Sequence, residues 1–318
     1  MLVTQLYNEE LKERFLKNYP EATRSTYRNI FKKITPKEKE LEKDVYQFNL
    51  EELDDLLYSF GTTSAQYIST VLAVMSKYID FCLQEGYVGN PTKINYAKLV
   101  NPKLENLKKY EHGLDKKYRY ITKDDLHNII NMCTNAQDAV IFALLFEGVM
   151  GENLEELINL RIDDCNFTNN ILTLRRNDGS IRQIEVENDT MQLIYKAANQ
   201  TEYYRVPDTI SGVFALQRTP YVLRPIISER VKDGKVSHQI IRIRIKKITE
   251  LYGNPYLNPK NIFRSGMIHH IKKYMEKHGI ISFGDLEYQD MVRILKRFGI
   301  EPSPQSIYLY RMRLREYI

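Results

Sequence analysis

The chain has 318 residues, 43% of them hydrophobic and 27% charged, so it is long enough for two domains and has an ordinary globular balance. The three cysteines are far apart and odd in number and form no CxxC or Cys/His spacing, which argues against a disulfide framework and a zinc site, and the net charge is +5. The longest apolar run, AVIFALLF, is far shorter than the roughly 20 residues that cross a bilayer, and the N-terminus lacks a signal-peptide pattern. We therefore expect a cytoplasmic protein without membrane association, metal or other cofactor.

Helical spacing of apolar residues predicts that the first part of the chain is helical. The first helix is expected within 8–19 and the second within 21–34, where Thr23 is the predicted N-cap. A third helix follows within 49–60, capped by Asn49. These helices are amphipathic, which predicts one shared core.

The longest helix is expected over 62–86, stopped by Gly86, and Gly89 and Pro91 are expected to close the unit. Residues 98–120 lack a clear apolar stripe and carry seven basic and three acidic side chains. We interpret this basic stretch as a linker and domain boundary.

After the linker, a helix capped by Thr122 precedes the apolar helix, and the hairpin pattern at 171–186 turns at Asn-Asp-Gly. A long irregular region is then expected, followed by a helix capped by Ser237 and by two more helices within 258–299. The last segment, 306–318, fits helical spacing and strand alternation equally well. The pattern predicts a mainly α protein with a small antiparallel β-sheet.

The basic residues are concentrated in the linker and at the C-terminus. Residues 238–318 carry 15 basic and 7 acidic side chains, whereas residues 1–97 and 121–237 are each net acidic. A local basic patch attracts polyanions whatever the average charge of the chain. This distribution favours nucleic-acid binding over a merely solvated basic surface.

The order of these elements resembles the tyrosine recombinases of the phage-integrase type. GYVGNP closes a helical unit, and RYITKDDLHNII resembles the opening of the family's catalytic domain. GENLEEL follows the apolar helix as the family's box "G-L-R-x-x-E-L" does, and FRSGMIHHIKK resembles the helix after "H-x-x-R". The resemblance implies a core-binding domain over 1–97, a basic interdomain linker over 98–120 and a catalytic-like domain over 121–318, with the hairpin in a three-stranded sheet.

In that family a tyrosine attacks a DNA phosphate and forms a 3′-phosphotyrosyl bond. Two arginines stabilise the negative charge of the transition state, and a histidine or lysine protonates the leaving oxygen. Losing one preorganised donor at such a site typically costs about 10²–10³ in rate.

Most of these groups are absent from the matching positions. The first arginine falls on Asn153, although Glu156 keeps the framework of the box. The hairpin lysine falls near Asn177, where Arg175 and Arg176 could place a charge nearby. The resemblance therefore implies a degenerate site here.

The same degeneracy continues toward the C-terminus. The histidine of "H-x-x-R" falls on Asn261, or on Lys260 if the register shifts by one, and Arg264 keeps the arginine. The histidine of the next box falls on Ile300. We expect Arg264 to contact phosphate or to form a buried ion pair.

The nucleophile position is bracketed by Tyr308 and Tyr310, in a chain with 23 tyrosines. We therefore expect no enzymatic activity, and a sequence-specific DNA-binding transcriptional regulator, a phage or prophage repressor of lytic genes that maintains lysogeny. Two alternatives are an active recombinase that uses Tyr308 or Tyr310 with Arg176, Lys260 and Arg264 as substitutes, and a helical interaction protein that has lost DNA binding.

The expected partner is double-stranded DNA of the bacterial nucleoid, and base contacts are expected from the Ser237-capped helix, whose basic residues alternatively form a solvated or phosphate-facing surface. The expected DNA contacts are Arg24, Arg28, Ser64, Gln66, Lys108, Lys109, Arg175, Arg176, His238, Gln239, Arg242, Lys246, Lys260 and Arg264. The family resemblance also suggests a homo-oligomer formed through the C-terminal segment. A protein or peptide antagonist is a further partner that the residues do not identify.

Overall fold

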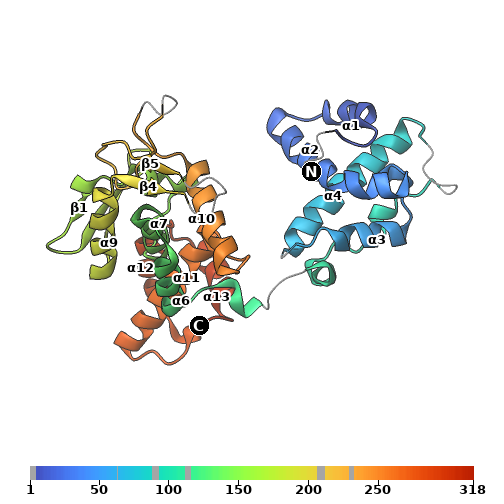
Figure 1. Ribbon diagram of the computed structural model, residues 1–318. Helices are drawn as coiled ribbons and strands as arrows, with labels where there is room; N and C mark the ends of the chain where they lie inside the picture. The colour runs from blue at the N-terminus through green and yellow to red at the C-terminus, as the bar shows by residue number, and fades with distance from the viewer. Residues whose placement is uncertain (1–4, 63, 88–92, 112–115, 206–211, 229–232) are drawn as a thin grey trace. The chain divides into compact units, whose positions relative to one another are not determined.

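The computed structural model describes residues 5–62, 64–87, 93–111, 116–205, 212–228 and 233–318. The chain divides into two compact units, residues 1–113 and 114–318 (Figure 1). Both are mainly helical, and the second also contains a three-stranded and a two-stranded antiparallel sheet. This confirms the predicted fold class. Within the described ranges, no helix is long and apolar enough to cross a membrane.

The N-terminal unit is built around α4, which is buried along one side by the other helices. Asn49 caps α3 as predicted, because its side chain accepts a hydrogen bond from the Glu52 backbone N–H at 2.9 Å. The predicted cap Thr23 is wrong: α2 begins at Glu21, and the carbonyl of Pro20 already accepts the bond from the Arg24 N–H. The elements of this unit are α1 (Glu9–Leu16), α2 (Glu21–Leu41), η1 (Val45–Gln47), α3 (Leu50–Ser59), α4 (Ala65–Gln84), η2 (Tyr96–Lys98), α5 (Leu104–Leu107) and η3 (Lys108–Tyr110).

A buried ion cluster lies inside this unit. The Lys12 ammonium is fully buried and donates to Glu38 Oε1 at 2.7 Å and to the Tyr7 carbonyl at 2.6 Å, with Asp44 Oδ2 at 3.5 Å. The Tyr78 hydroxyl donates to Asp44 Oδ2 at 2.9 Å. Burial raises the pKa of Glu38 to about 7, with Lys12 opposing the shift. The cluster joins α1, α2 and α4.

The segment expected as a linker, 98–120, is in large part a piece of the N-terminal unit. Leu107 and Tyr110 are fully buried in that unit's core, and the Tyr110 hydroxyl donates to Asp54 of α3. Two buried side chains fix this stretch although it has no continuous apolar stripe, so the predicted boundary at 98 is too early. Gly86 has φ 84° just after α4, as expected for a helix stop, whereas Gly89 and Pro91 lie outside the described residues.

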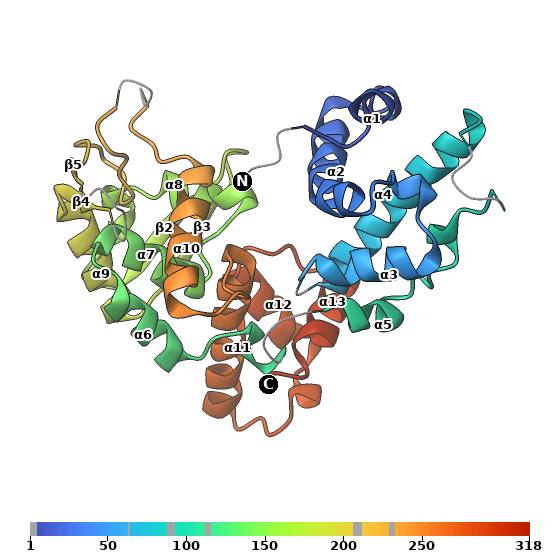
Figure 2. The same ribbon diagram turned by 45° about the vertical axis from the view of Figure 1, so that its right-hand side comes forward.

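The second unit packs helices around a small sheet (Figures 1 and 2). The predicted hairpin is β2–β3, and β1 extends it to the expected three-stranded sheet. Thr122 and Ser237 cap α6 and α10 as predicted. The elements are η4 (Lys116–Arg119), α6 (Lys123–Met132), α7 (Ala136–Phe146), η5 (Glu152–Leu154), α8 (Glu155–Asn159), η6 (Ile162–Asp164), β1 (Cys165–Asn166), β2 (Ile171–Arg175), β3 (Ile181–Glu185), α9 (Asn188–Asn199), β4 (Glu202–Tyr204), β5 (Val213–Ala215), α10 (His238–Tyr252), α11 (Pro259–His278), η7 (Phe283–Asp285), α12 (Tyr288–Arg297) and α13 (Pro304–Leu314).

Two regions differ from or extend the sequence prediction. The region expected to be irregular contains α9 and the β4–β5 pair, because Met191, Ile194 and Ala197 form a buried helical stripe. The ambiguous C-terminal segment is the helix α13, which turns Ile307 and Leu314 into the core.

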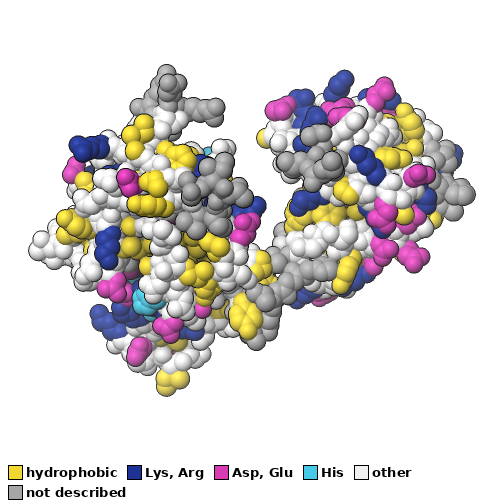
Figure 3. Space-filling model, viewed as in Figure 1, with side chains coloured by type: hydrophobic (Ala, Val, Ile, Leu, Met, Phe, Trp, Pro, Cys, Tyr) yellow, Lys and Arg dark blue, Asp and Glu magenta, His cyan; other side chains and the backbone are white. Residues whose placement is uncertain are grey.

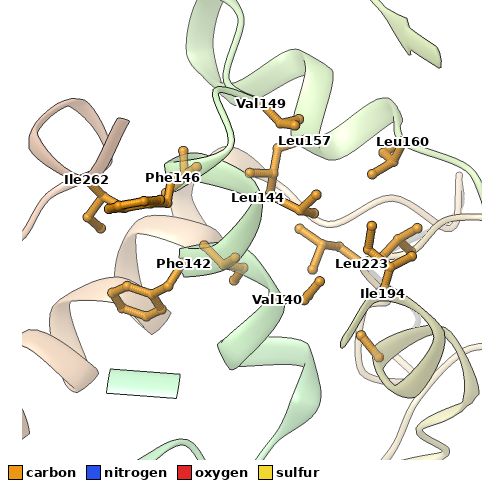
Figure 4. Packing of buried hydrophobic residues seen from close by; sticks show 14 of the residues in the cluster. Val140, Phe142, Leu144, Phe146, Val149, Leu157, Leu160, Ile194, Leu223 and Ile262 are labelled. Carbon is orange, nitrogen blue, oxygen red and sulfur yellow. The ribbon is translucent and has the colours of Figure 1, made fainter. Parts of the chain in front are cut away.

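The core of the second unit centres on α7, which is apolar and buried on all sides. Figure 4 shows its side chains between those of neighbouring elements, among them Leu157, Ile194 and Ile262. Gly266 lets α11 pack directly on the end of α7: an added Cβ would lie 1.6 Å from the Phe146 carbonyl oxygen. This packing fixes the turn after α7, where the candidate site begins.

Candidate nucleic-acid interface and recombinase-like site

The turn after α7 places Asn153 on the surface and Glu156 in the interior. Asn153 and Leu154 both have left-handed backbone conformations, with φ 49° and 69°. Asparagine tolerates this conformation better than most L-residues, and Leu154 is held there by burial. Position 153 therefore presents a neutral side chain at the surface.

Glu156 is fully buried and receives hydrogen bonds from two arginines of the β2–β3 hairpin. Arg176 Nε donates to Oε1 at 2.8 Å, and Arg182 donates through Nε to Oε1 at 2.8 Å and through Nη2 to Oε2 at 2.6 Å. The Met150 backbone N–H adds a fourth bond at 3.1 Å. Burial alone would raise the pKa of Glu156, but the bonds from Arg182 and Arg176 outweigh it and lower the pKa. The carboxylate is thus ionised and forms an ion pair with each of the two guanidinium groups, which leaves this group of three side chains with one excess positive charge.

The same arginines also bind the backbone after α12. Arg176 Nη2 donates to the Gly299 carbonyl at 2.5 Å, and Arg182 donates to the carbonyls of Arg297 and Gly148. Gly299 has φ 65°, and a Cβ there would lie 2.3 Å from Arg176 Nη2. Arg176, predicted to contact DNA, is therefore a structural link between the hairpin, the turn after α7 and the turn after α12.

The other hairpin positions are also engaged. Arg175 Nε donates to Asp164 Oδ1 at 3.0 Å from a half-exposed side chain. The Asn177 N–H donates to Glu155 Oε2 at 2.9 Å, and its side-chain oxygen accepts from Asn159 at 3.0 Å. The position matched to the family's lysine thus carries an amide in a closed turn.

The start of α11 contains Lys260, which is exposed, and Asn261, whose side-chain nitrogen donates to the Tyr256 carbonyl at 2.9 Å. Arg264 is half-buried and donates to Asn261 Oδ1 at 3.4 Å. Among the described residues Arg264 has no carboxylate partner, so the ion pair considered from the sequence is not formed there. The guanidinium of Arg264 is therefore available to bind an anion.

The C-terminal positions are divided between core and surface. Ile300 packs beside the core formed by α11, α12 and α13, as does Tyr310. Tyr308 is 62% exposed on α13. No hydrogen bond joins Tyr308 or Tyr310 to Arg264 within the described ranges.

Helix α10 presents a polar and mostly basic face. Ser237 Oγ accepts from the Ile240 N–H at 3.3 Å, and Gln239, Arg242 and Lys246 are exposed, whereas His238 is half-buried. Lys246 Nζ lies 3.6 Å from Glu250 Oε1. The first turns of α10 therefore hold the contact residues expected of a helix that binds in a groove of DNA.

Arg244 of α10 points inward. Its side chain is almost fully buried, its Nε lies 3.7 Å from Asp138 Oδ1, and it lies over the Tyr203 ring at 4.6 Å. Burial raises the pKa of Asp138, with Arg244 opposing the shift. Arg244 is therefore an anchor that attaches α10 to α7 and β4, and it does not belong to the basic surface considered from the sequence.

In the N-terminal unit, most of the predicted contacts have protein partners. Arg28 bonds to Glu13 Oε2 at 2.7 Å, Arg24 lies 3.3 Å from Glu21, and Lys109 donates to Asp54 at 2.6 Å. Ser64 caps α4, and Gln66 and Lys108 are exposed. Figure 3 shows Lys and Arg beside Asp and Glu on the face drawn, in mixed clusters. Exposed ion pairs contribute at most about 1 kcal/mol each to stability, so a DNA phosphate can displace the carboxylate partner of Arg24, Arg28 or Lys109.

The cavity of about 700 Å³ at α11 and α12 lies apart from these positions. Its lining includes Glu147, Glu187, His269, His270 and Lys273, and none of the predicted contact residues.

Arg182 was not among the residues predicted from the sequence. The sequence does contain a signal for it. Arg182 lies two residues before the apolar Ile184 in β3, so both side chains lie on the same face of the strand, and an arginine on a buried face requires a partner.

The chain matches two domain families along most of its length. Residues 120–318 match "MrpR, C-terminal catalytic domain" and residues 6–84 match "MrpR, N-terminal core-binding domain". The "SPbeta prophage-derived uncharacterized protein YopR" of Bacillus subtilis (strain 168) is 28% identical over 320 residues, covering 98% of this chain and 94% of its own. Tyrosine recombinase XerA of Pyrococcus horikoshii is 22% identical over 200 residues, covering 58% of this chain and 66% of its own.

Solved structures share the fold at low identity. A lambda integrase dimer bound to a COC′ core site aligns with a TM-score of 0.51 and 11% identity, over 95% of this chain and 76% of that chain. A second structure, lambda integrase(75-356) bound to the same kind of site, gives a TM-score of 0.50 and 10% identity, over 95% and 94%. The architecture is that of tyrosine recombinases.

Proposed function

Because the chain belongs to the MrpR family of tyrosine-recombinase-like proteins, we propose that it is a sequence-specific regulator of transcription that binds double-stranded DNA without cutting it. In this proposal it represses lytic genes of a prophage, at the nucleoid in the bacterial cytoplasm. The prophage origin of a relative supports the biological setting, and the DNA-bound integrases of the same fold support the partner.

The observation that carries the proposal is the pairing of Arg176 and Arg182 with Glu156. A pentacoordinate phosphate needs uncompensated cations that are already in place. The hairpin arginines are instead held in ion pairs with Glu156 inside the protein, and the turn after α7 offers the neutral Asn153. Arg264 alone, of the positions matched to the family's arginines, is a cation without a carboxylate partner among the described residues. One cation can hold a phosphate but gives little transition-state stabilisation.

Binding needs less than cleavage does. Lys and Arg side chains gain affinity by displacing the counterions of DNA, and the exposed Arg242 and Lys246 of α10 meet this requirement. Gln239 lies at the start of the same helix, where a side chain can contact the edge of a base. We therefore assign α10 to base contacts, and the Lys260 and Arg264 side chains to phosphate.

The binding half of the proposal is tested by selecting duplexes from a random-sequence library with the full-length protein. We expect enrichment of one motif, and affinity for it that falls steeply with salt. Arg242→Ala should reduce the slope of log K against log[salt] by about 0.9. The control is Lys273→Ala: Lys273 is exposed on α11 and lines the cavity at α11 and α12, where none of the assigned contact residues lies, so the slope should not change. Equal binding to every sequence would contradict the proposal.

The absence of cleavage is tested separately with the selected duplex carrying a nick near its centre, which traps a covalent recombinase. We expect no SDS-resistant protein–DNA adduct. An adduct that disappears in Tyr308→Phe or Tyr310→Phe would instead establish the alternative, an active recombinase with an atypical site.

A further inference from the structure

The exposed face of α10 has an isoleucine at its centre. Ile243 is 55% exposed, although α10 buries Ile241, Ile245 and Ile248 on its opposite side. On a helix, residues three and four positions apart are neighbours. Ile243 therefore lies between Gln239 and Lys246, with Arg242 beside it. Figure 1 shows α10 at the edge of the second unit.

The surroundings of Ile243 indicate what can cover it. An apolar protein surface that covered Ile243 would have to bury the adjoining guanidinium of Arg242 and ammonium of Lys246, and burying unpaired charges is costly. A polyanion satisfies both cations. The matching partner must therefore be anionic around its edge and apolar at one point.

The major groove of DNA has this combination. Phosphates border the groove, and the C5-methyl group of thymine is the apolar group that the base pairs display in it. We propose that Ile243 contacts the C5-methyl group of thymine and so sets a preference for thymine at one position of the binding site. This inference rests on the proposed function, because it assigns a base to the helix that the function uses.

The charge of α10 also indicates which part of the helix enters the groove. Glu250 follows Ile243 by two turns on the same face, and its carboxylate would repel phosphate even though Lys246 is 3.6 Å away. The segment from His238 to Lys246 has no acidic residue. Ile243 thus lies in the half of α10 that a polyanion can approach, one turn from Gln239, which can pair with adenine.

The test compares thymine with uracil, which lacks the methyl group and pairs identically. Duplexes selected by the full-length protein are resynthesised with deoxyuridine at each thymidine in turn. Loss of one buried methyl should weaken binding about fourfold at one or two positions. Ile243→Ala should bind both duplexes equally, and with about the affinity that the wild type has for the uracil duplex, or weaker.

The matched control is Leu251→Ala, which removes an apolar side chain that is 44% exposed near the other end of α10, next to Glu250. It should keep the discrimination between thymine and uracil. Both variants should fold, because the sites are exposed and alanine is the best helix former; circular dichroism checks this.

Three outcomes overturn the inference. One is that the wild type binds every uracil duplex as tightly as the parent duplex, and another is that Ile243→Ala still discriminates between thymine and uracil. Either result removes Ile243 from base contact and leaves the proposed function intact. If no sequence is enriched in the selection, the proposed function fails and this inference fails with it.

Discussion

Replacing Glu156 by glutamine should destabilise the second unit strongly while leaving its shape almost unchanged. The carboxylate accepts three bonds from Arg176 and Arg182, which are 27% and 16% exposed. Removing one partner from a buried ion pair costs about 3–5 kcal/mol, because the remaining charge is uncompensated. The arginines keep backbone acceptors at Gly148, Arg297 and Gly299, so we expect the lower end, about 3 kcal/mol.

For a unit of the size of residues 114–318, 1 kcal/mol corresponds to about 2–4 °C. Glu156→Gln should therefore lower the melting temperature of this unit by about 6–12 °C in differential scanning calorimetry of the full chain. Glu155→Gln is the control, since Glu155 accepts bonds from the Glu152 and Asn177 N–H groups at 3.2 and 2.9 Å, and an amide oxygen can replace it at a cost of about 1 kcal/mol. Equal shifts for the two variants would refute the assignment of Glu156 as the counter-ion of both arginines.

Two further predictions concern packing and pH. Gly266→Ala should destabilise the second unit by about 3 kcal/mol or more, because the added Cβ would lie 1.6 Å from the Phe146 carbonyl oxygen. The control is Gly279→Ala, where φ is 65° but the space around the added Cβ is open, so the cost should be about 1 kcal/mol. Equal melting temperatures for the two variants would contradict this prediction. The folded-state pKa of Glu38, about 7, lies above its ordinary 4.5, so its contribution to the free energy of unfolding is fully present below pH 4.5 and is lost as the pH rises to about 7. The difference in that free energy between wild type and Glu38→Gln, measured with urea, should therefore fall over this window, and a constant difference would disprove the shift.

Features that depend on neighbouring residues were predictable from the sequence. Asn49, Thr122 and Ser237 cap helices because each side chain reaches a backbone N–H three residues ahead. The β2–β3 hairpin likewise follows from its Asn-Asp-Gly turn. Such signals are local, so the surrounding fold does not change them.

Contacts between distant residues were not predictable in the same way. Glu156 lies 20 residues before Arg176 and 26 before Arg182, and no spacing rule connects them. The burial of Leu107 and Tyr110 likewise depends on helices from the start of the chain. The sequence could identify which positions of the candidate site lack a cation, but only the fold shows that the nearby arginines already pair with Glu156.

The left-handed turn at Asn153 and Leu154 bears on what an arginine at position 153 would require. A single substitution could place arginine there, where the family's box has it. Arginine would then have to adopt φ 49°, the conformation that Asn153 has now, which costs a residue with a Cβ roughly 1–2 kcal/mol relative to the right-handed region. Asparagine suits the turn, so the backbone itself favours keeping it. An arginine at position 153 would thus favour a backbone conformation different from that of the present asparagine, and the turn would have to change together with the side chain.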